Sequence, residues 1–111
     1  MTQEQLRNLN TIVTTYGDDP QMDMCIEECA ELQKALLKYR RKKKGFSSDD
    51  EVKTAKANVV DELADVCVMV EQMKIVYGYE AVEERIKFKI DRQMDRLRNR
   101  GREDADKTGE G

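Results

Sequence analysis

The chain has 111 residues, of which 39% are charged and 39% hydrophobic, and its formal net charge is −3. Aromatic residues make up only 5%, with six glycines and one proline, and this composition favours helices over a β-sandwich or barrel. Because the sequence contains no histidine, it offers no imidazole base, no two-histidine zinc site and no Glu-x-x-His pair of the di-iron bundles.

Hydrophobic periodicity predicts helices from the start of the chain. The first runs from about residue 6 to Tyr16 and stops at Gly17, where a glycine is typical of a helix C-terminus. The segment Asp18-Asp19-Pro20 is then expected to form a turn. The second helix is predicted over residues 21–44, and Gly45 interrupts it.

The third predicted helix covers residues 49–77. Ser48 and Glu51 match the Ser-x-x-Glu capping box at its start, and Gly78 closes it. Residues 66–70 are hydrophobic on every side of this helix, so we expect the middle of the helix to be buried all round.

A fourth helix is predicted from about residue 80. The expected fold is therefore an all-α four-helix bundle over residues 1–100, followed by a disordered polar tail over residues 101–111, which hold no large hydrophobic side chain. Three neighbouring helices of this size cannot enclose a helix that is hydrophobic all round. We therefore expect a homo-oligomer.

The cysteines and the N-terminus bear on the cellular compartment. Three cysteines, an odd number, argue against a secreted disulfide framework, and residues 1–5 lack the character of a signal peptide. The longest hydrophobic run, residues 66–70, is far too short to cross a membrane. The sequence thus predicts a soluble, cytoplasmic protein with no membrane partner.

Carboxylates interrupt the hydrophobic pattern of two helices. Glu62 and Asp65 lie three residues apart, so the most hydrophobic stretch of the chain carries two like charges on one face. Burying such a group without a partner is costly. Glu28 and Glu31 repeat this spacing on the second helix. If the two helices pack together, the four carboxylates converge and require cations, and oxygen ligands alone favour Mg²⁺, Mn²⁺ or Ca²⁺.

The order and spacing of these acids resemble the motifs of a known family. Glu27-Glu28-Cys29-Ala30-Glu31 fits a Glu-Glu-x-x-Glu motif, and Glu62-Leu63-Ala64-Asp65 fits Glu-x-x-Asp. In this respect the chain resembles the MazG-like, all-α nucleoside triphosphate pyrophosphohydrolase superfamily over about residues 6–100. The flanking residues that continue the similarity are Gln21-Met22-Asp23, Leu37-Lys38-Tyr39-Arg40-Arg41, Glu71-Gln72-Met73, Tyr77-Gly78 and Phe88-Lys89-Ile90-Asp91-Arg92.

The resemblance implies a hydrolase of nucleotide-pool housekeeping that assembles as a homodimer or homotetramer. Such an enzyme cleaves a nucleoside triphosphate between its α- and β-phosphates and releases a monophosphate and pyrophosphate. By motif match, Glu28, Glu31, Glu62 and Asp65 would hold the cofactor Mg²⁺, for which Mn²⁺ is a substitute. Glu27 and Glu28 are the catalytic candidates, and Glu27 would position a water or form an outer-shell bond.

Cleavage at the α-phosphorus also requires positive charge that stabilises the pyrophosphate leaving group. Two sets of bases are spaced to share a helix face, and for each the alternative is an ordinary solvated surface. These phosphate-binding candidates are Lys89, Arg92 and Arg96 on the fourth helix and Lys34 and Lys38 on the second.

The resemblance also implies contacts to the nucleobase of the substrate. The family commonly binds the base with residues before the first motif and with residues of a partner subunit. In this chain the corresponding candidates are Tyr16, Gln21 and Asp23.

Other functions stay open on the sequence alone. A phosphoribosyl-ATP pyrophosphohydrolase-like enzyme has similar acidic motifs, although the flanking residues fit it less well. A non-catalytic helical bundle that acts as an interaction module, or holds a metal structurally, belongs to a different class. Nucleic-acid binding through the basic run at residues 40–44 is disfavoured by the net charge of −3 and the scarcity of aromatic residues.

Overall fold

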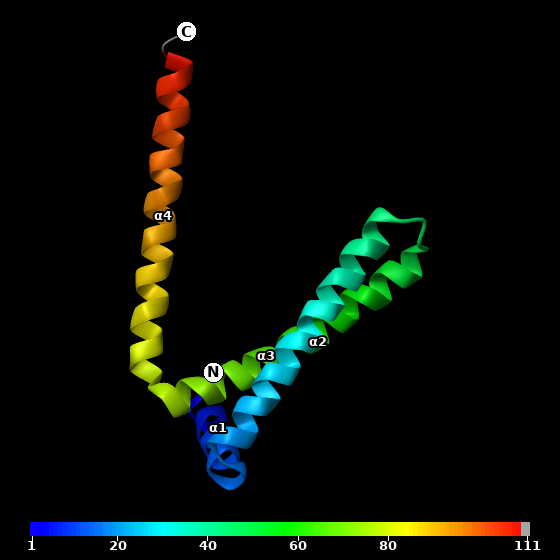
Figure 1. Ribbon diagram of the computed structural model, residues 1–111, viewed down its shortest axis with the longest axis vertical. Helices are drawn as coiled ribbons and strands as arrows, with labels where there is room; N and C mark the ends of the chain where they lie inside the picture. The colour runs from blue at the N-terminus through cyan, green and yellow to red at the C-terminus, as the bar shows by residue number, and fades with distance from the viewer. Residues whose placement is uncertain (110–111) are drawn as a thin grey trace. The chain divides into compact units, whose positions relative to one another are not determined.

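The computed structural model describes residues 1–109, with the side chains of residues 1–105 (Figure 1). Over this part of the chain the protein is all-helical, with no strand, which confirms the predicted all-α class. It divides into two units, Met1–Val76 and the residues from Tyr77 onward. The four helices are α1 (Gln3–Tyr16), α2 (Asp18–Lys44), α3 (Asp49–Tyr77) and α4 (Tyr79–Gly109).

The junction between α1 and α2 is tighter than predicted. Gly17 has a φ of 94°, a conformation that glycine adopts at little cost, and α2 starts at the next residue. Asp18, Asp19 and Pro20, which we expected to form a turn, are therefore the first turn of α2. Proline is tolerated there because the first helical N–H groups have no intrahelical acceptor, and the two carboxylates favour the positive end of the helix dipole.

The start of α3 agrees with the sequence prediction. The backbone N–H of Glu51 donates to Ser48 Oγ at 3.2 Å, so Ser48 caps the helix. The pKa of the Glu51 carboxyl is lowered first by Lys42 and then by hydrogen bonds with the hydroxyl and the backbone of Ser48, as expected of a capping box. The carboxylate accepts from the Ser48 hydroxyl at 3.3 Å and from Lys42 Nζ at 2.9 Å. The contact with Lys42 ties the end of α2 to the start of α3.

Helices α2 and α3 run antiparallel beside each other, as Figure 1 shows in cyan and green. The Lys42–Glu51 ion pair joins them near their connection, and a buried hydrogen bond from Gln21 Nε2 to Gln72 Oε1, at 2.7 Å, joins them at the far end. The buried hydrophobic side chains of α2 and α3 among the described residues are Ala35, Ala55 and Met69, and α1 adds Leu9 and Val13.

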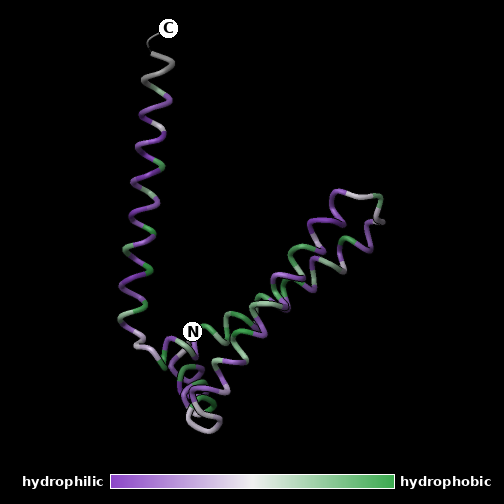
Figure 2. Tube along the Cα trace, viewed as in Figure 1, coloured by the Kyte–Doolittle hydropathy of each residue, from purple (hydrophilic) through white to green (hydrophobic). Residues whose placement is uncertain are grey.

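The middle of α3 is not buried all round, so that prediction is wrong for the single chain. Val60 and Leu63 are 61% and 49% exposed, and Val68 and Val70 also face solvent. Hydrophobic segments recur along α3 in Figure 2. The exposure of these side chains shows that the other helices cover only part of the α3 surface. The hydrophobic side chains of α2 that are also exposed are Met24, Ile26, Leu36 and Leu37.

The buried amide pair gives a stability prediction. Gln72 is only 2% exposed and supplies the acceptor for Gln21. Replacing Gln72 by Leu should lower the free energy of unfolding by about 1–3 kcal/mol, because the Gln21 amide is left buried without its partner. The Gln21→Leu/Gln72→Leu double variant should recover much of this loss, and urea denaturation measures both. Losses that simply add would contradict the coupling.

The second unit consists of α4, which begins after Gly78, a residue with a φ of 114°. The helix continues to Gly109, so residues 101–109, for which we expected disorder, are helical in the structure. The segment carries two bases and three acids and no large hydrophobic side chain, a composition that a helix accepts at its surface. Residues 110 and 111 of the predicted tail lie outside the described residues, and the domain boundary at residue 100 stays a prediction.

Over the described residues, every helix falls short of the combined length and hydrophobicity that a membrane span requires.

Candidate metal centre

Three of the four predicted metal ligands meet between α2 and α3. One carboxylate oxygen each from Glu28, Glu62 and Asp65 lies within 4.8 Å of the other two, and we refer to these three residues as the acidic cluster. Glu28 and Glu62 are half-buried, whereas Asp65 is exposed. The convergence follows from the two sequence spacings, because each motif places its acids on the face that its helix turns to the other.

The register of the helix pair determines which residues meet. The separation in sequence between Glu28 and Lys42 on α2 equals the separation between Glu51 and Asp65 on α3. Because the helices are antiparallel, the register that brings Lys42 to Glu51 near their connection also brings Glu28 to face Asp65 further along.

Crowding of like charges perturbs the acidic cluster. Partial desolvation is the largest influence that raises the pKa of Glu28, followed by the negative charges of Asp65 and Glu62. Desolvation is also the first cause that raises the pKa of Glu62, followed by the charges of Asp65 and Glu31. Both carboxylates are therefore easier to protonate than isolated ones. A bound cation would relieve the same repulsion.

The donor set fits a hard divalent cation. The cluster offers carboxylate oxygens from three side chains, and oxygen donors without nitrogen or sulfur suit Mg²⁺, Mn²⁺ and Ca²⁺. Mg²⁺ typically takes only a few carboxylates and fills the remaining positions with water or substrate phosphates. The donor set of the cluster therefore suits a hard divalent cation as a class and does not single out one of the three ions.

Glu31 and Glu27 stand beside this cluster. Glu31 is turned toward Lys34 Nζ at 3.5 Å and its side chain is 53% exposed, so it is not in the group of oxygens that meet. Its charge still contributes to the raised pKa values of Glu28 and Glu62. Because an exposed ion pair is weak, a rotation of the Glu31 side chain toward the cluster costs little. Glu27 is exposed, and its charge also acts on Glu28.

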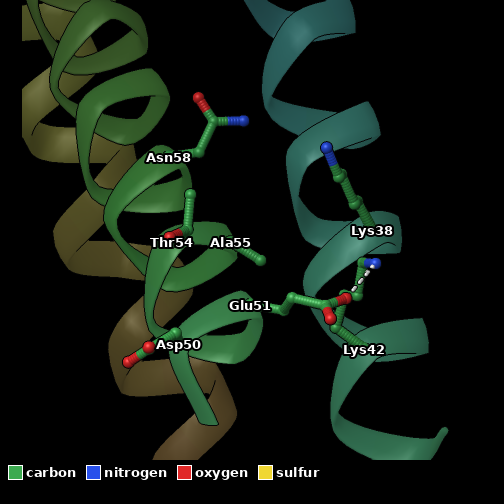
Figure 3. A pocket seen from close by; sticks show the side chains of 7 residues that line it. All are labelled: Lys38, Lys42, Asp50, Glu51, Thr54, Ala55 and Asn58. Atoms are coloured by element: carbon green, nitrogen blue, oxygen red, sulfur yellow. Dashed lines mark hydrogen bonds and ion pairs between the residues drawn. The ribbon is translucent and has the colours of Figure 1, made fainter. Parts of the chain in front are cut away.

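The two predicted phosphate-binding lysines of α2 differ in their surroundings. Lys34 is exposed and paired with Glu31. Lys38 instead lines a groove of about 570 Å³ between α2 and α3, which Figure 3 shows from close by.

The remaining phosphate-binding candidates belong to the second unit. As their spacing predicted, Lys89, Arg92 and Arg96 share a face of α4 and line a shallow hollow of about 340 Å³. Arg92 also lies over the ring of Phe88, with its guanidinium 5.8 Å from the ring centre. A contact of these bases with phosphate stays a prediction.

The base-binding candidates are not gathered together. Gln21 is buried and engaged with Gln72, an arrangement that serves the packing of α2 on α3. Asp23 and Tyr16 are exposed. A role in base recognition stays a prediction for all three, and the occupied amide of Gln21 counts against that residue.

Sequence reasoning missed two polar residues of α3. Asn58 precedes Glu62 by one helical turn and lines the same groove as Lys38. Lys74 is buried and forms an ion pair with Glu71 at 2.9 Å. The helical spacing from Glu62 identifies Asn58 once uncharged residues are considered, whereas the buried Lys74 has no such signal.

Metal binding can be tested through stability. Mg²⁺ at ten times its dissociation constant should contribute about 1.4 kcal/mol to the free energy of unfolding. For a domain of this size, each 1 kcal/mol corresponds to a rise of about 4–8 °C in the melting temperature. Differential scanning fluorimetry with MgCl2, and with NaCl at the same ionic strength, measures the effect. A melting curve insensitive to both Mg²⁺ and EDTA would contradict the assignment.

Comparison with known proteins adds no assignment. No protein-family model matches the chain, and neither the curated proteins nor the solved structures yield a match. The resemblance to the MazG-like superfamily therefore stays a prediction from the motifs.

Proposed function

We propose that this chain is a Mg²⁺-dependent, cytoplasmic pyrophosphohydrolase that converts a nucleoside or deoxynucleoside triphosphate to its monophosphate and pyrophosphate. The observation that supports the proposal is the meeting of Glu28, Glu62 and Asp65 within 4.8 Å. Two of these acids are half-buried against like charge, a costly arrangement that a cation and a phosphate together would make favourable.

Each residue then has a defined task. Glu28, Glu62 and Asp65 hold the cation, and Glu31 joins them by leaving Lys34. A Mg²⁺ ion bound there supplies charge neutralisation for the phosphates and makes the α-phosphorus more electrophilic. Glu27, exposed beside Glu28, orients the attacking water and accepts its proton.

The proposed enzyme is a homo-oligomer, as a dimer or tetramer. The exposed hydrophobic side chains of α2 and α3 support this part of the proposal, because a second copy would remove them from water. They lie on the same two helices that carry the acidic cluster.

A substrate screen tests the activity. The purified chain is incubated with each common NTP and dNTP in the presence of Mg²⁺, and pyrophosphate and orthophosphate are quantified separately. The proposal expects pyrophosphate in equal amount to the monophosphate, and no turnover with EDTA. Release of orthophosphate alone, or no turnover of any triphosphate, would refute it. Including phosphoribosyl-ATP among the substrates separates the related enzyme class.

A further inference from the structure

The groove between α2 and α3 is lined by two lysines and two acids, which are Lys38, Lys42, Asp50 and Glu51, together with hydrogen-bonding groups of Thr54 and Asn58. Lys38 lines it from α2, and Thr54 and Asn58 line it from α3. In Figure 3 the ammonium group of Lys38 and the amide of Asn58 extend toward the gap between the two helices, whereas Asp50 points away from that gap. The groove measures about 570 Å³ and opens to solvent.

The groove and the acidic cluster lie on the same helix faces. On α3, Asn58 precedes Glu62 by four residues, so the two side chains are neighbours on the helix surface. On α2, Lys38 follows Glu31 by two helical turns, which corresponds to a rise of about 10 Å. A ligand held by a cation at the cluster therefore reaches Lys38 and Asn58 if it extends toward the α2–α3 connection.

Lys38 differs from the lysines on either side of it. The charge of Lys34 is paired with Glu31 at 3.5 Å, and that of Lys42 with Glu51 at 2.9 Å. Among the side chains that the structure describes, no carboxylate lies within ion-pair distance of Lys38. Lys42 and Glu51 pair with each other within the lining of the groove, so Lys38 is the lining lysine whose ammonium group is open to a ligand.

From this arrangement we infer that the α2–α3 groove binds the terminal phosphate of the substrate, and that Lys38 and Asn58 select triphosphates over diphosphates. The inference rests on the proposed function for the identity of the substrate. The phosphate chain runs from the acidic cluster toward the α2–α3 connection. Lys38 donates charge-assisted hydrogen bonds to the γ-phosphate, and the Asn58 amide donates a further bond. A diphosphate, held by its other end at the cluster, is one phosphate shorter and lacks the group that Lys38 would bind.

A binding experiment with inorganic tripolyphosphate and Mg²⁺ tests this inference without requiring catalysis. Calorimetry compares the wild-type chain with the Lys38→Met and Asn58→Ala variants. The control is Lys53→Met, which removes the same charge from an exposed position on α3 outside the groove. Losing a charge-assisted hydrogen bond should weaken tripolyphosphate binding about tenfold or more for Lys38→Met, and less for Asn58→Ala. Circular dichroism verifies that all variants fold.

A kinetic arm measures selectivity where turnover is present. Lys38→Met should lose most of the preference of kcat/KM for a nucleoside triphosphate over the corresponding diphosphate, and Lys53→Met should keep it. Equal binding of tripolyphosphate by these two variants, or no binding by the wild-type chain, would overturn the inference while leaving the proposed hydrolysis to its own test. Binding that depends on Lys38 in a protein that releases no pyrophosphate would instead refute the hydrolysis and retain the groove.

Discussion

Replacement of Glu62 by Gln should lower the rate of pyrophosphate release at least about 100-fold. Loss of a group that only supports a metal ligand already lowers activity by about 10- to 100-fold, and loss of the ligand itself should cost more. The amide keeps the size of the side chain and removes only its charge. Asp65→Asn should have the same effect, since both residues supply oxygens to the acidic cluster. The rate is measured at saturating Mg²⁺ with the best substrate from the screen.

The matched control is Glu4→Gln, which makes the same chemical change at an exposed position in the first turn of α1. This control should retain the wild-type rate. If the Glu62→Gln variant turned over substrate at the wild-type rate, the acidic cluster would not be the catalytic centre. A thermal melt of each variant separates loss of chemistry from loss of folded protein.

The same Glu62→Gln substitution should raise the stability of the metal-free protein at pH 7. The pKa of Glu62 is raised in the folded state above its ordinary value of 4.5, first by desolvation and then by neighbouring carboxylates. Between 4.5 and that raised value the folded chain binds more protons than the unfolded chain, so the free energy of unfolding falls as the pH rises. The glutamine side chain does not titrate, so repulsion from the neighbouring carboxylates does not lower the free energy of unfolding of the variant.

Urea denaturation with EDTA present, at pH 7 and at a pH well below 4.5, measures this linkage. The stability advantage of Glu62→Gln should be largest at pH 7 and should disappear at the lower pH, where the wild-type carboxyl is protonated in both states. Added Mg²⁺ should reverse the order at pH 7 by stabilising only the wild-type chain. A variant that is less stable than the wild type without metal would instead identify Glu62 as a structural residue.

Helix bounds were predictable where a local signal exists. The limits of α3 follow from the Ser48 cap and from Gly78, and both act through bonds or dihedral angles of a few adjacent residues. The prediction of a turn at Asp18-Asp19-Pro20 was wrong because the same residue types favour both a turn and the first turn of a helix. The choice between them depends on Gly17, whose positive φ reverses the chain before the aspartates are reached.

The acidic cluster was predictable in composition and less so in detail. The spacing of each motif fixes the helix face, so the convergence of Glu28, Glu62 and Asp65 follows once α2 and α3 are antiparallel. The side-chain rotamer of Glu31 could not be predicted from the spacing, because Lys34 competes with the cluster for the Glu31 carboxylate. The exposure of Val60 could not be predicted either. Hydrophobic periodicity identifies the face of a helix that packs against neighbours, but not how many neighbouring helices are present.

The equal spacing of the Lys42–Glu51 ion pair from the acidic cluster on both helices makes the site sensitive to chain length. Deleting one residue from α2 between Glu28 and Lys42 would rotate Glu28 by about 100° around the helix axis and carry it away from Asp65. By contrast, inserting about seven residues into each helix between the ion pair and the cluster would leave Glu28 facing Asp65, because seven residues complete nearly two turns. Natural length variants of such a hairpin should therefore differ by heptads added to both helices.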